Sequence, residues 1–302
     1  MQISVVICTH NPRPDYLQRA LDALKTQTLP KEQWELLLID NASKEPLVSK
    51  WDLSWNPHAR YIREDELGLT RARLRGINES IGEILVFVDD DNVLAFDYLE
   101  HALRIAKEWP VLGAWGGSSI PWFETEPPAW SKRYLHYLAL REIHEDKWSN
   151  YCDKPRLMPW GAGMCVRRVV AAEYFRKAKD DNVRRNLDRS GHSLASCGDS
   201  DLAITACEMG LGTGLFRSLR LTHLISAERV REAHLLKLLE GMVYSLHVLS
   251  AARDKPRKPT SWPRWIWGHI AALRRGKREL RFFLASQRGA RAARNEIRSW
   301  RT

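Results

Sequence analysis

Cysteine is scarce in this sequence, and its placement does not indicate a disulfide framework. The 302 residues include five cysteines, an odd number, and no two of them form a C-x-x-C pair. This pattern is typical of small buried or unpaired thiols in a reducing compartment. The cysteines are Cys8, Cys152, Cys165, Cys197 and Cys207.

A leader sequence and long apolar runs are also missing. The first residues, "MQISVVICTHNP", lack the basic region of a secretory signal, and polar residues interrupt the apolar part early. No stretch approaches the ~20 consecutive apolar residues that a membrane-spanning helix needs. We therefore expect a cytoplasmic protein, and peripheral contact with the inner face of the cell membrane stays open.

A dinucleotide fingerprint is absent from the place where it would stand. After the first apolar run the chain reads "THNPRP" (Thr9–Pro14) instead of G-x-G-x-x-G. The absence counts against a dinucleotide site. It also counts against a nucleotidyltransferase, which would usually carry a glycine-rich basic loop there.

Acidic residues are nearly missing from the last part of the chain. The formal net charge is +10, but residues 251–302 contain fifteen Lys or Arg against three acids. The rest of the chain therefore carries about −2. The basic character belongs to this segment alone.

Four short apolar runs, with amphipathic stretches between them, make up the first part of the chain. The stretches Asp15–Thr28, Leu69–Ser80 and Ala95–Trp109 have apolar residues at helical spacing. Alternation of strand and helix predicts an α/β doubly wound domain, with a mostly parallel sheet flanked by helices. The predicted strands are Ile3–Thr9, Glu35–Asp40, Ala59–Glu64 and Glu83–Asp89.

The second half has a different texture. Residues 112–160 are rich in Trp, Gly and Pro and predict a long irregular region. Beyond it we expect a strand at 163–168, a capped helix that begins near "CGDSDL" and a strand that runs through His223. A helix over 229–249, a linker and a basic helical segment follow.

Three consecutive carboxylates, Asp89, Asp90 and Asp91, end the strongest predicted strand. Such charges repel one another by roughly 4 kcal/mol at 4 Å for an effective dielectric near 20, so they need compensation. A solvated acidic turn is one interpretation. A site for Mg²⁺ or Mn²⁺, which prefer carboxylate oxygens, is the other, and the position after a buried strand favours it.

Several arginines are predicted near the same edge of the sheet. Any of them could meet a diphosphate, although at least two could equally be solvated helix residues. They are Arg13, Arg71, Arg73 and Arg75.

Taken together, these motifs resemble a known enzyme family. The segments "SVVICTHNPRPDYLQRALDALKTQT", "ELLLIDNAS" and "LGLTRARLRGINESIGEILVFVDDDN", followed by "GDSDL", are similar in order and spacing to a family 2 glycosyltransferase of the GT-A fold. The resemblance extends from Ile3 to His223. It implies an inverting enzyme that moves a sugar from a UDP-sugar to an acceptor hydroxyl of a polysaccharide, glycan or lipid-linked acceptor.

The resemblance also implies roles for the nucleotide-side residues. Thr9, Asn11 and Arg13 would frame the base, and Asp40 would hydrogen-bond the uracil. Of the D-x-D motif, Asp91 would bind the metal, and Asp89 would touch the ribose or a metal-bound water. The intervening Asp90 and the basic Arg71 complete the expected nucleotide-binding set. Mn²⁺ or Mg²⁺ is the implied cofactor.

On the acceptor side, the resemblance places the catalytic base in "CGDSDL". Asp199 aligns with the catalytic aspartate, and Asp201 stands at a commonly acidic position two residues later. Gly198 replaces a frequent glutamate, so the base stays open between these two aspartates. Both could instead cap the helix. His223 resembles a histidine that completes the metal shell, although a lone histidine at a strand end is often structural.

An acceptor platform is implied as well. Trp160 and Gly161, in "PWGAGMCVRR", would offer a stacking surface and a close backbone approach to a sugar.

The resemblance and the charge distribution divide the chain into a catalytic domain, 1–250, and a basic amphipathic helical extension, 251–302. The catalytic domain comprises a nucleotide-sugar half, 1–118, and an acceptor-side half, 119–250.

The basic extension carries an apolar stripe headed by tryptophans. Its pattern is typical of a helix in an anionic membrane interface, but packing on the domain or a solvated extension would fit too. Nucleic acid is a less favoured partner, because no other feature of the sequence suggests a binding groove. The alternative from another class of function is a non-catalytic adaptor that binds a membrane or a nucleic acid through this extension. The stripe is formed by Ile266, Ile270, Leu273, Leu280 and Leu284, after Trp262, Trp265 and Trp267.

Overall fold

The computed structural model describes the chain except residues 49, 152–156, 192–194, 258–260 and 301–302. Cys152 and part of the predicted linker lie outside the described residues. Of the other cysteines, Cys8, Cys165 and Cys197 are buried thiols without a disulfide, as the sequence predicted.

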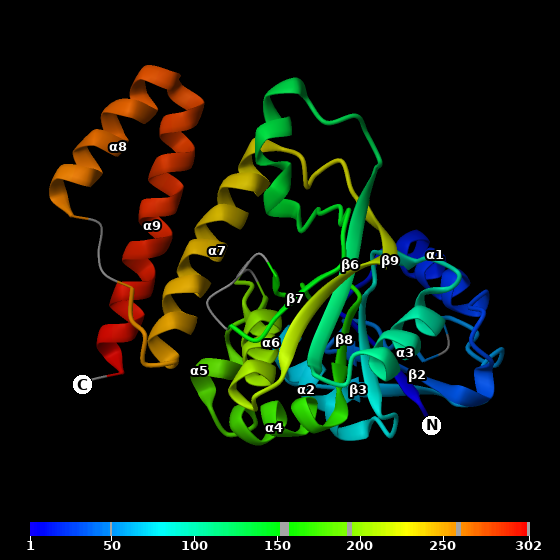
Figure 1. The fold of residues 1–302 in the computed structure, drawn as a ribbon. Coiled ribbons are helices and arrows are strands. Elements are labelled where there is room, and N and C mark those ends of the chain that lie inside the picture. The colour runs from blue at the N-terminus through cyan, green and yellow to red at the C-terminus, as the bar shows by residue number, and fades with distance from the viewer. Residues whose placement is uncertain (49, 152–156, 192–194, 258–260, 301–302) are drawn as a thin grey trace.

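A single twisted sheet forms the centre of the molecule, with helices on both faces (Figure 1). Its strand order is β3-β2-β1-β4-β8-β6-β9-β5, and β7 pairs with β9. The strands from β3 to β4 are parallel, whereas β8 is antiparallel to both β4 and β6. The strands of the described residues are β1 Ile3–Thr9, β2 Trp34–Asn41, β3 Ala59–Glu64, β4 Ile84–Asp89, β5 Asn92–Leu94, β6 Leu112–Phe123, β7 Lys147–Ser149, β8 Met164–Arg167 and β9 Gly212–Ile225.

Buried apolar residues line both faces of the central strands. Every residue of β1 and β2 is buried, which is why these strands appear as continuous apolar runs in the sequence. The helices of the described residues are α1 Pro14–Lys25, α2 Leu69–Glu79, α3 Tyr98–Glu108, α4 Arg168–Ala178, α5 Asn182–Arg185, α6 Gly198–Glu208, α7 Glu232–Ala252, α8 Trp262–Arg275 and α9 Lys277–Ser299, with short 3-10 segments η1 Lys31–Gln33 and η2 Ala129–Leu138.

The prediction of an irregular region over 112–160 was wrong for its first part, which is the strand β6. Glycines hide this strand in the sequence. A side chain at Gly117 would collide with the backbone carbonyl of Leu219 on β9. The register also shifts between Gly116 and Ser118, as at a β-bulge. The glycines therefore mark a close approach of two strands.

The basic extension is a pair of helices, and the predicted stripe, which Lys277 interrupts in the sequence, is divided between them. Gly276, with φ of 114°, separates α8 from α9. Phe282 and Ala285 of α9 are buried in a cluster with Leu235 of α7, whereas α8 lies at the edge of the molecule (Figure 1).

Helix α7 corrects a further prediction, that no segment is apolar enough for a membrane span. By length and composition α7 could cross a membrane, although such evidence from one helix is weak. Short polar interruptions such as Glu240 hid it from a search for continuous runs. Its apolar residues pack against η2 and α9 and face a cavity.

Candidate active site

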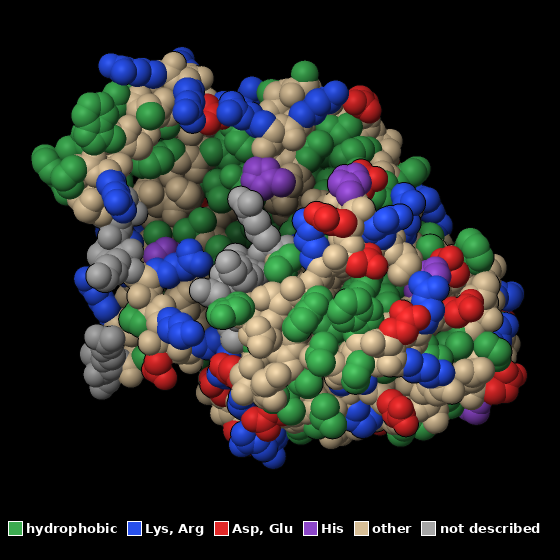
Figure 2. Space-filling view, in the orientation of Figure 1, with side chains coloured by type: hydrophobic (Ala, Val, Ile, Leu, Met, Phe, Trp, Pro, Cys, Tyr) green, Lys and Arg blue, Asp and Glu red, His purple; other side chains and the backbone are tan. Residues whose placement is uncertain are grey.

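A cavity of about 560 Å³ opens at the carboxyl ends of β1 and β4. Figure 2 shows the molecule hollowed between the sheet and the helical part that contains α7. Ligands of open α/β sheets bind at such an edge. Among the described residues that line the cavity are five aspartates and three arginines, so carboxyl groups outnumber guanidinium groups in its wall.

The consecutive aspartates lie at one end of this cavity. Asp89 ends β4, and Asp91 precedes β5, whose Asn92 pairs with His223 of β9. The backbone N–H of Leu224 donates to the carbonyl of Asp91 over 2.8 Å. This pairing brings His223 Nε2 within 3.3 Å of Asp91 Oδ2, although the two residues are far apart in the sequence.

The three carboxylates have different electrostatic environments. Burial, aided by the charge of Asp91, raises the pKa of Asp90 to about 7. The hydroxyl of Thr9 donates to that carboxylate. Burial also acts on Asp91, but His223 and Arg229 outweigh it and hold the pKa of Asp91 below its ordinary value. The cluster therefore keeps at least one firmly ionised carboxylate beside a histidine.

Arg229 takes a position that the sequence did not predict. Its Nη1 lies 2.6 Å from Asp91 Oδ2 and 3.0 Å from His223 Nε2. Its guanidinium thus places a positive charge between the carboxylate and the imidazole. No pattern in the sequence marks this residue, since it reaches the cavity from the turn after β9.

These residues fit a divalent cation in part. A carboxylate oxygen and an imidazole nitrogen that already share one cation are suitable donors for Mn²⁺ or Mg²⁺. Within the described residues, however, no group of three or more His, Cys, Asp or Glu is arranged as a complete metal site. A cation held by Asp91 and His223 would need its remaining ligands from a bound substrate or water, and Arg229 would have to move.

Asp199 also lines the cavity, from the first turn of α6. Its Oδ2 accepts the backbone N–H of Gly161 at 2.8 Å, and its Oδ1 accepts that of Ser200 at 2.6 Å. These bonds fix the carboxylate without using all of its lone pairs. Asp199 can therefore accept a further proton donor from the cavity.

A buried ion pair, which the sequence did not predict, supports this arrangement. Arg73 Nη1 donates to Asp188 Oδ2 at 2.7 Å. Asp188 Oδ1 accepts the backbone N–H of Gly198, the first residue of α6. Arg73 was one of four candidate arginines, whereas Asp188 lies in a loop with no motif around it. Together they anchor the start of the helix that carries Asp199.

Trp160 and Gly161, the predicted acceptor platform, both line the cavity, and their role toward an acceptor stays a prediction. The guanidinium of Arg141 lies 3.4 Å from the centroid of the Trp160 ring and covers one of its faces. A side chain at Gly161 would collide with the guanidinium of Arg73. Gly161 is therefore required by its protein neighbours, whatever approaches from the cavity.

One part of the cavity wall is apolar. It is formed by residues of η2, of the loop before Trp160 and of one face of α7. Leu238, Met242 and Leu246 follow one another at a spacing of one helical turn. This apolar wall consists of Tyr137, Leu138, Met158, Leu238, Met242 and Leu246.

Four predicted nucleotide-binding residues do not line the cavity. Asn11 bonds the loop at Ser43 and Lys44. Arg13 pairs with Asp15 and Glu124, and Arg71 pairs with Glu66. Asp40 is fully buried, and protein donors engage its carboxylate. They are the backbone N–H of Ser43, the hydroxyl of Tyr61 and the guanidinium of Arg63. The roles of Asn11, Arg13, Asp40 and Arg71 in nucleotide binding stay predictions.

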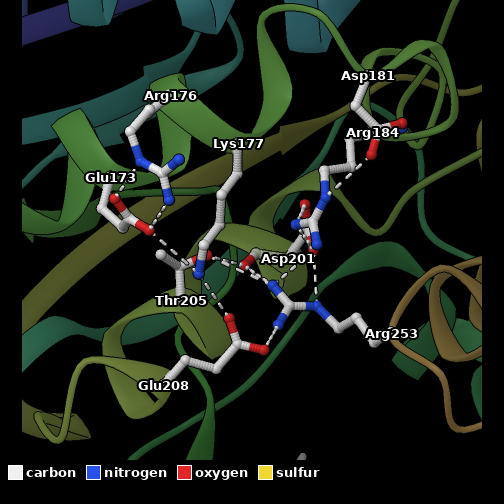
Figure 3. A network of polar contacts seen from close by, with 9 residues as sticks. All are labelled: Glu173, Arg176, Lys177, Asp181, Arg184, Asp201, Thr205, Glu208 and Arg253. Carbon is white, nitrogen blue, oxygen red and sulfur yellow. Dashed lines mark hydrogen bonds and ion pairs between the residues drawn. The ribbon is translucent and has the colours of Figure 1, made fainter.

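Asp201 is not among the residues that line the cavity. Its carboxylate lies in an arginine–carboxylate network (Figure 3). Arg184 Nη1 lies 2.9 Å from Asp201 Oδ2, and Arg253 Nη2 lies 2.6 Å from Asp201 Oδ1. Burial raises the pKa of Asp201, and the two arginines oppose that rise. The network comprises Glu173, Arg176, Lys177, Asp181, Arg184, Asp201, Thr205, Glu208 and Arg253.

Comparisons with known proteins agree on the type of fold. A family model described as "Glycosyl transferase family 2" matches residues 4–162. Glycosyltransferase AglE of Haloferax volcanii is 32% identical over 92 residues, which are 30% of this chain and 30% of AglE. The putative glycosyltransferase EpsH of Bacillus subtilis is 26% identical over 108 residues, 35% of this chain and 30% of EpsH. The matches therefore span about a third of these relatives.

A solved structure resembles the whole chain. The structure of Staphylococcus aureus TarS 1–349 in complex with UDP-GlcNAc has a TM-score of 0.54 and 14% identity, and the match covers 100% of this chain and 92% of that chain. At this identity the similarity concerns the fold alone. It confirms the predicted fold class, an α/β fold of the GT-A type.

Proposed function

The chain belongs to glycosyl transferase family 2, and on this premise we propose that it transfers a sugar from a UDP-sugar to an acceptor hydroxyl, with inversion and with the help of a divalent cation. The observation that carries the proposal is the common cavity of Asp91, His223 and Asp199. The proposed binding site for the donor diphosphate, at Asp91 and His223, and the proposed base, Asp199, would therefore act on substrates bound in the same cavity.

UDP is the nucleotide that the comparisons favour. TarS, which shares the fold, is described in complex with UDP-GlcNAc. The carboxyl edge of β1 and β4 would hold the nucleoside diphosphate, with Thr9 and Asp89 at its side of the cavity. Asp40 would contribute indirectly, because its carboxylate accepts the backbone N–H groups of Ser43 and Leu47 and so shapes the loop after β2.

A divalent cation, Mn²⁺ or Mg²⁺, would be held by Asp91 and His223. When bound, it would neutralise the diphosphate as a leaving group. The excess of carboxylates over arginines in the cavity wall supports this assignment. Among the described groups, Asp91 is the natural ligand because its pKa is lowered and it stays ionised at neutral pH.

Asp199 is the residue that we assign as general base. Its carboxylate lines the cavity and is oriented by two backbone N–H groups. It would accept the proton of the acceptor hydroxyl as that oxygen attacks the sugar. We assign Asp201 no part in this step, because it is fully buried and paired with two arginines.

The acceptor would lie between Asp199 and the apolar wall. Trp160 could stack on a sugar ring with the part of its surface that Arg141 leaves open. The apolar wall would suit an acceptor with an apolar portion, such as a lipid-linked sugar, although a glycan also fits the polar end. A cytoplasmic location agrees with such a donor and remains part of the proposal.

A UDP-release assay over a panel of UDP-, GDP- and dTDP-sugars, with and without Mn²⁺, tests the proposal. We expect slow hydrolysis of one UDP-sugar without acceptor and faster release when lipid-linked or soluble glycan acceptors are added. Release of pyrophosphate from a nucleoside triphosphate and a sugar phosphate would instead identify a nucleotidyltransferase. If the protein neither binds nor hydrolyses any of these nucleotide sugars, the remaining interpretation is a non-catalytic adaptor.

A further inference from the structure

We propose that helix α8 docks the protein on an anionic lipid surface. The starting observation is the exposure of its large apolar side chains. The exposed fraction is 74% for Trp262, 70% for Trp267 and 56% for Leu273. Tryptophans this exposed, clustered on one short helix, are unusual on a soluble surface and mark an interaction site.

One face of α8 packs on α9, and the other faces solvent. Its inner face contacts α9, where Trp265 and His269 lie against the ring of Phe283. Gly268 allows this approach, because a side chain there would meet the same ring. At 100° per residue, Trp267 and Ile270 project from the opposite side. The outward apolar side chains of α8 therefore stay exposed to solvent after the helix has packed on α9.

Basic residues lie among and beside these exposed apolar side chains, and α8 has no acidic residue. Arg264, Arg274 and Arg275 belong to α8, and Lys277 follows at the turn. Figure 2 shows the hydrophobic side chains of this part of the molecule beside Lys and Arg side chains. A helix surface that combines exposed tryptophans with arginines matches the interface of a bilayer that contains anionic lipids.

This charge pattern selects lipid over other partners. A second copy on the same face would bring together basic residues with no acids on the helix to pair with them. A nucleic acid would gain from the arginines, but its phosphate backbone would leave Trp262, Trp267 and Leu273 without an apolar partner. A bilayer interface satisfies both the apolar and the basic groups.

Helix α9, on which α8 packs, is fixed to α7, a helix that forms part of the cavity wall. Gly289 of α9 lies against the backbone of Glu240 and Tyr244 on α7. Arg278 and Arg288 add ion pairs to Glu232 and Glu240, both at 2.8 Å. Since α7 also forms the apolar wall, docking through α8 would hold the cavity in one orientation above the membrane.

Vesicle sedimentation of the full chain tests the proposal. We expect the protein to pellet with vesicles of phosphatidylcholine with about a third phosphatidylglycerol, and much less with phosphatidylcholine alone. A triple variant, Trp262→Ser, Trp267→Ser and Leu273→Ser, should lose this binding. A charge variant, Arg264→Gln, Arg274→Gln and Arg275→Gln, should bind anionic vesicles about 10²-fold more weakly.

A matched control replaces exposed apolar residues elsewhere, Trp122→Ser and Trp148→Ser, which are 41% and 46% exposed. It should bind vesicles like the wild type, and all variants should keep the wild-type circular dichroism spectrum and melting temperature. Wild-type protein that ignores the vesicles, or a triple variant that binds them equally, would overturn the proposal. So would a concentration-dependent dimer that the triple variant abolishes, since the face would then join two copies. UDP binding without vesicles reports separately on the proposed function.

Discussion

Two carboxylate-containing regions of the molecule start from the same turn of helix α6 and differ in their charge balance. On one side, Asp199 faces a cavity whose described wall has five aspartates and three arginines. On the other, Asp201 joins the network of Figure 3, in which four carboxylates meet four cationic side chains. The balanced region lacks charge for a ligand to compensate, whereas the unbalanced one has an excess that a cation can neutralise.

The difference teaches how to separate a site from a scaffold when the same residue types build both. Burial and arginine contacts are common to the two regions, so neither identifies the site. What distinguishes the cavity is the carboxylate left with a lone pair free, and the surplus of negative charge around it. The predictions below are ordered from the largest expected effect to the smallest.

The sharpest contrast is Asp199→Asn. Asparagine can keep the bond from the Gly161 N–H but cannot take a proton from the acceptor. We expect the transfer rate to fall by about 10²–10⁴-fold, with UDP and metal binding nearly unchanged. Initial rates of UDP release and calorimetry measure the two effects. A variant that retains transfer would show that the base lies elsewhere.

Asp201→Asn should damage the fold instead of the chemistry. It leaves Arg184 and Arg253 without their shared buried carboxylate, and breaking such a pair costs about 3–5 kcal/mol of unfolding free energy. Urea denaturation measures this loss. The fraction that stays folded should transfer sugar at the wild-type rate. Abolished transfer in a protein of wild-type stability would exchange the roles of the two aspartates.

Asp91→Asn tests the charge surplus of the cavity. It removes the ionised partner of His223 and Arg229, so we expect UDP affinity in the presence of Mn²⁺ to fall by about 10–100-fold, the worth of one charged contact. The remaining affinity should no longer depend on the metal. Calorimetry with and without Mn²⁺ compares the two conditions, and unchanged affinity would remove Asp91 from the metal site.

Arg229→Ala should have the opposite sign. Because the guanidinium lies between Asp91 and His223, a divalent cation has to displace it. We expect Mn²⁺ affinity without nucleotide to rise by about tenfold, the equivalent of about 1.4 kcal/mol, as measured by the paramagnetic signal of free Mn²⁺. Arg229→Lys, which keeps the charge, is the control. A fall in affinity would mean that Arg229 helps to build the site.

At the edge of the network, Arg176→Gln should have the smallest effect. Its side chain is 68% exposed and pairs with Glu173 one helical turn away. Exposed pairs of this kind add little to stability. We expect the urea midpoint to match the wild type, and a clear shift would mean that the network depends on its rim as well as on Asp201.

The central strands could be predicted closely from the sequence. β1 and β3 have the predicted bounds, Ile3–Thr9 and Ala59–Glu64, because buried parallel strands and amphipathic helices alternate with distinct periods. β6 could not be predicted in this way. Its glycines are set by the approach of β9, a contact between segments far apart in the chain, which local periodicity does not encode.

The site divides along the same line. Asp91 follows β4, His223 lies near the end of β9 and Asp199 begins α6; the family resemblance had given each of them a role, and all three line one cavity. Asp188 and Arg229 enter from loops whose course depends on tertiary packing, and no motif marked them. Asp201 shows a further limit, because a spacing of two residues on a helix turns the second side chain about 200° away from the first.

The short ladder between β5 and β9 links ligand binding to the cooperativity of the whole domain. Asn92 pairs with His223 across 131 positions of the chain, so the two sides of the predicted metal site come together only when a long-range contact closes. Such contacts form late and slow the search for the native state. A ligand that bridges Asp91 and His223 would therefore stabilise the entire sheet, by about 2.7 kcal/mol at a hundredfold excess over its dissociation constant. The melting temperature of the intact chain would then report on occupancy of a site that spans only a few side chains.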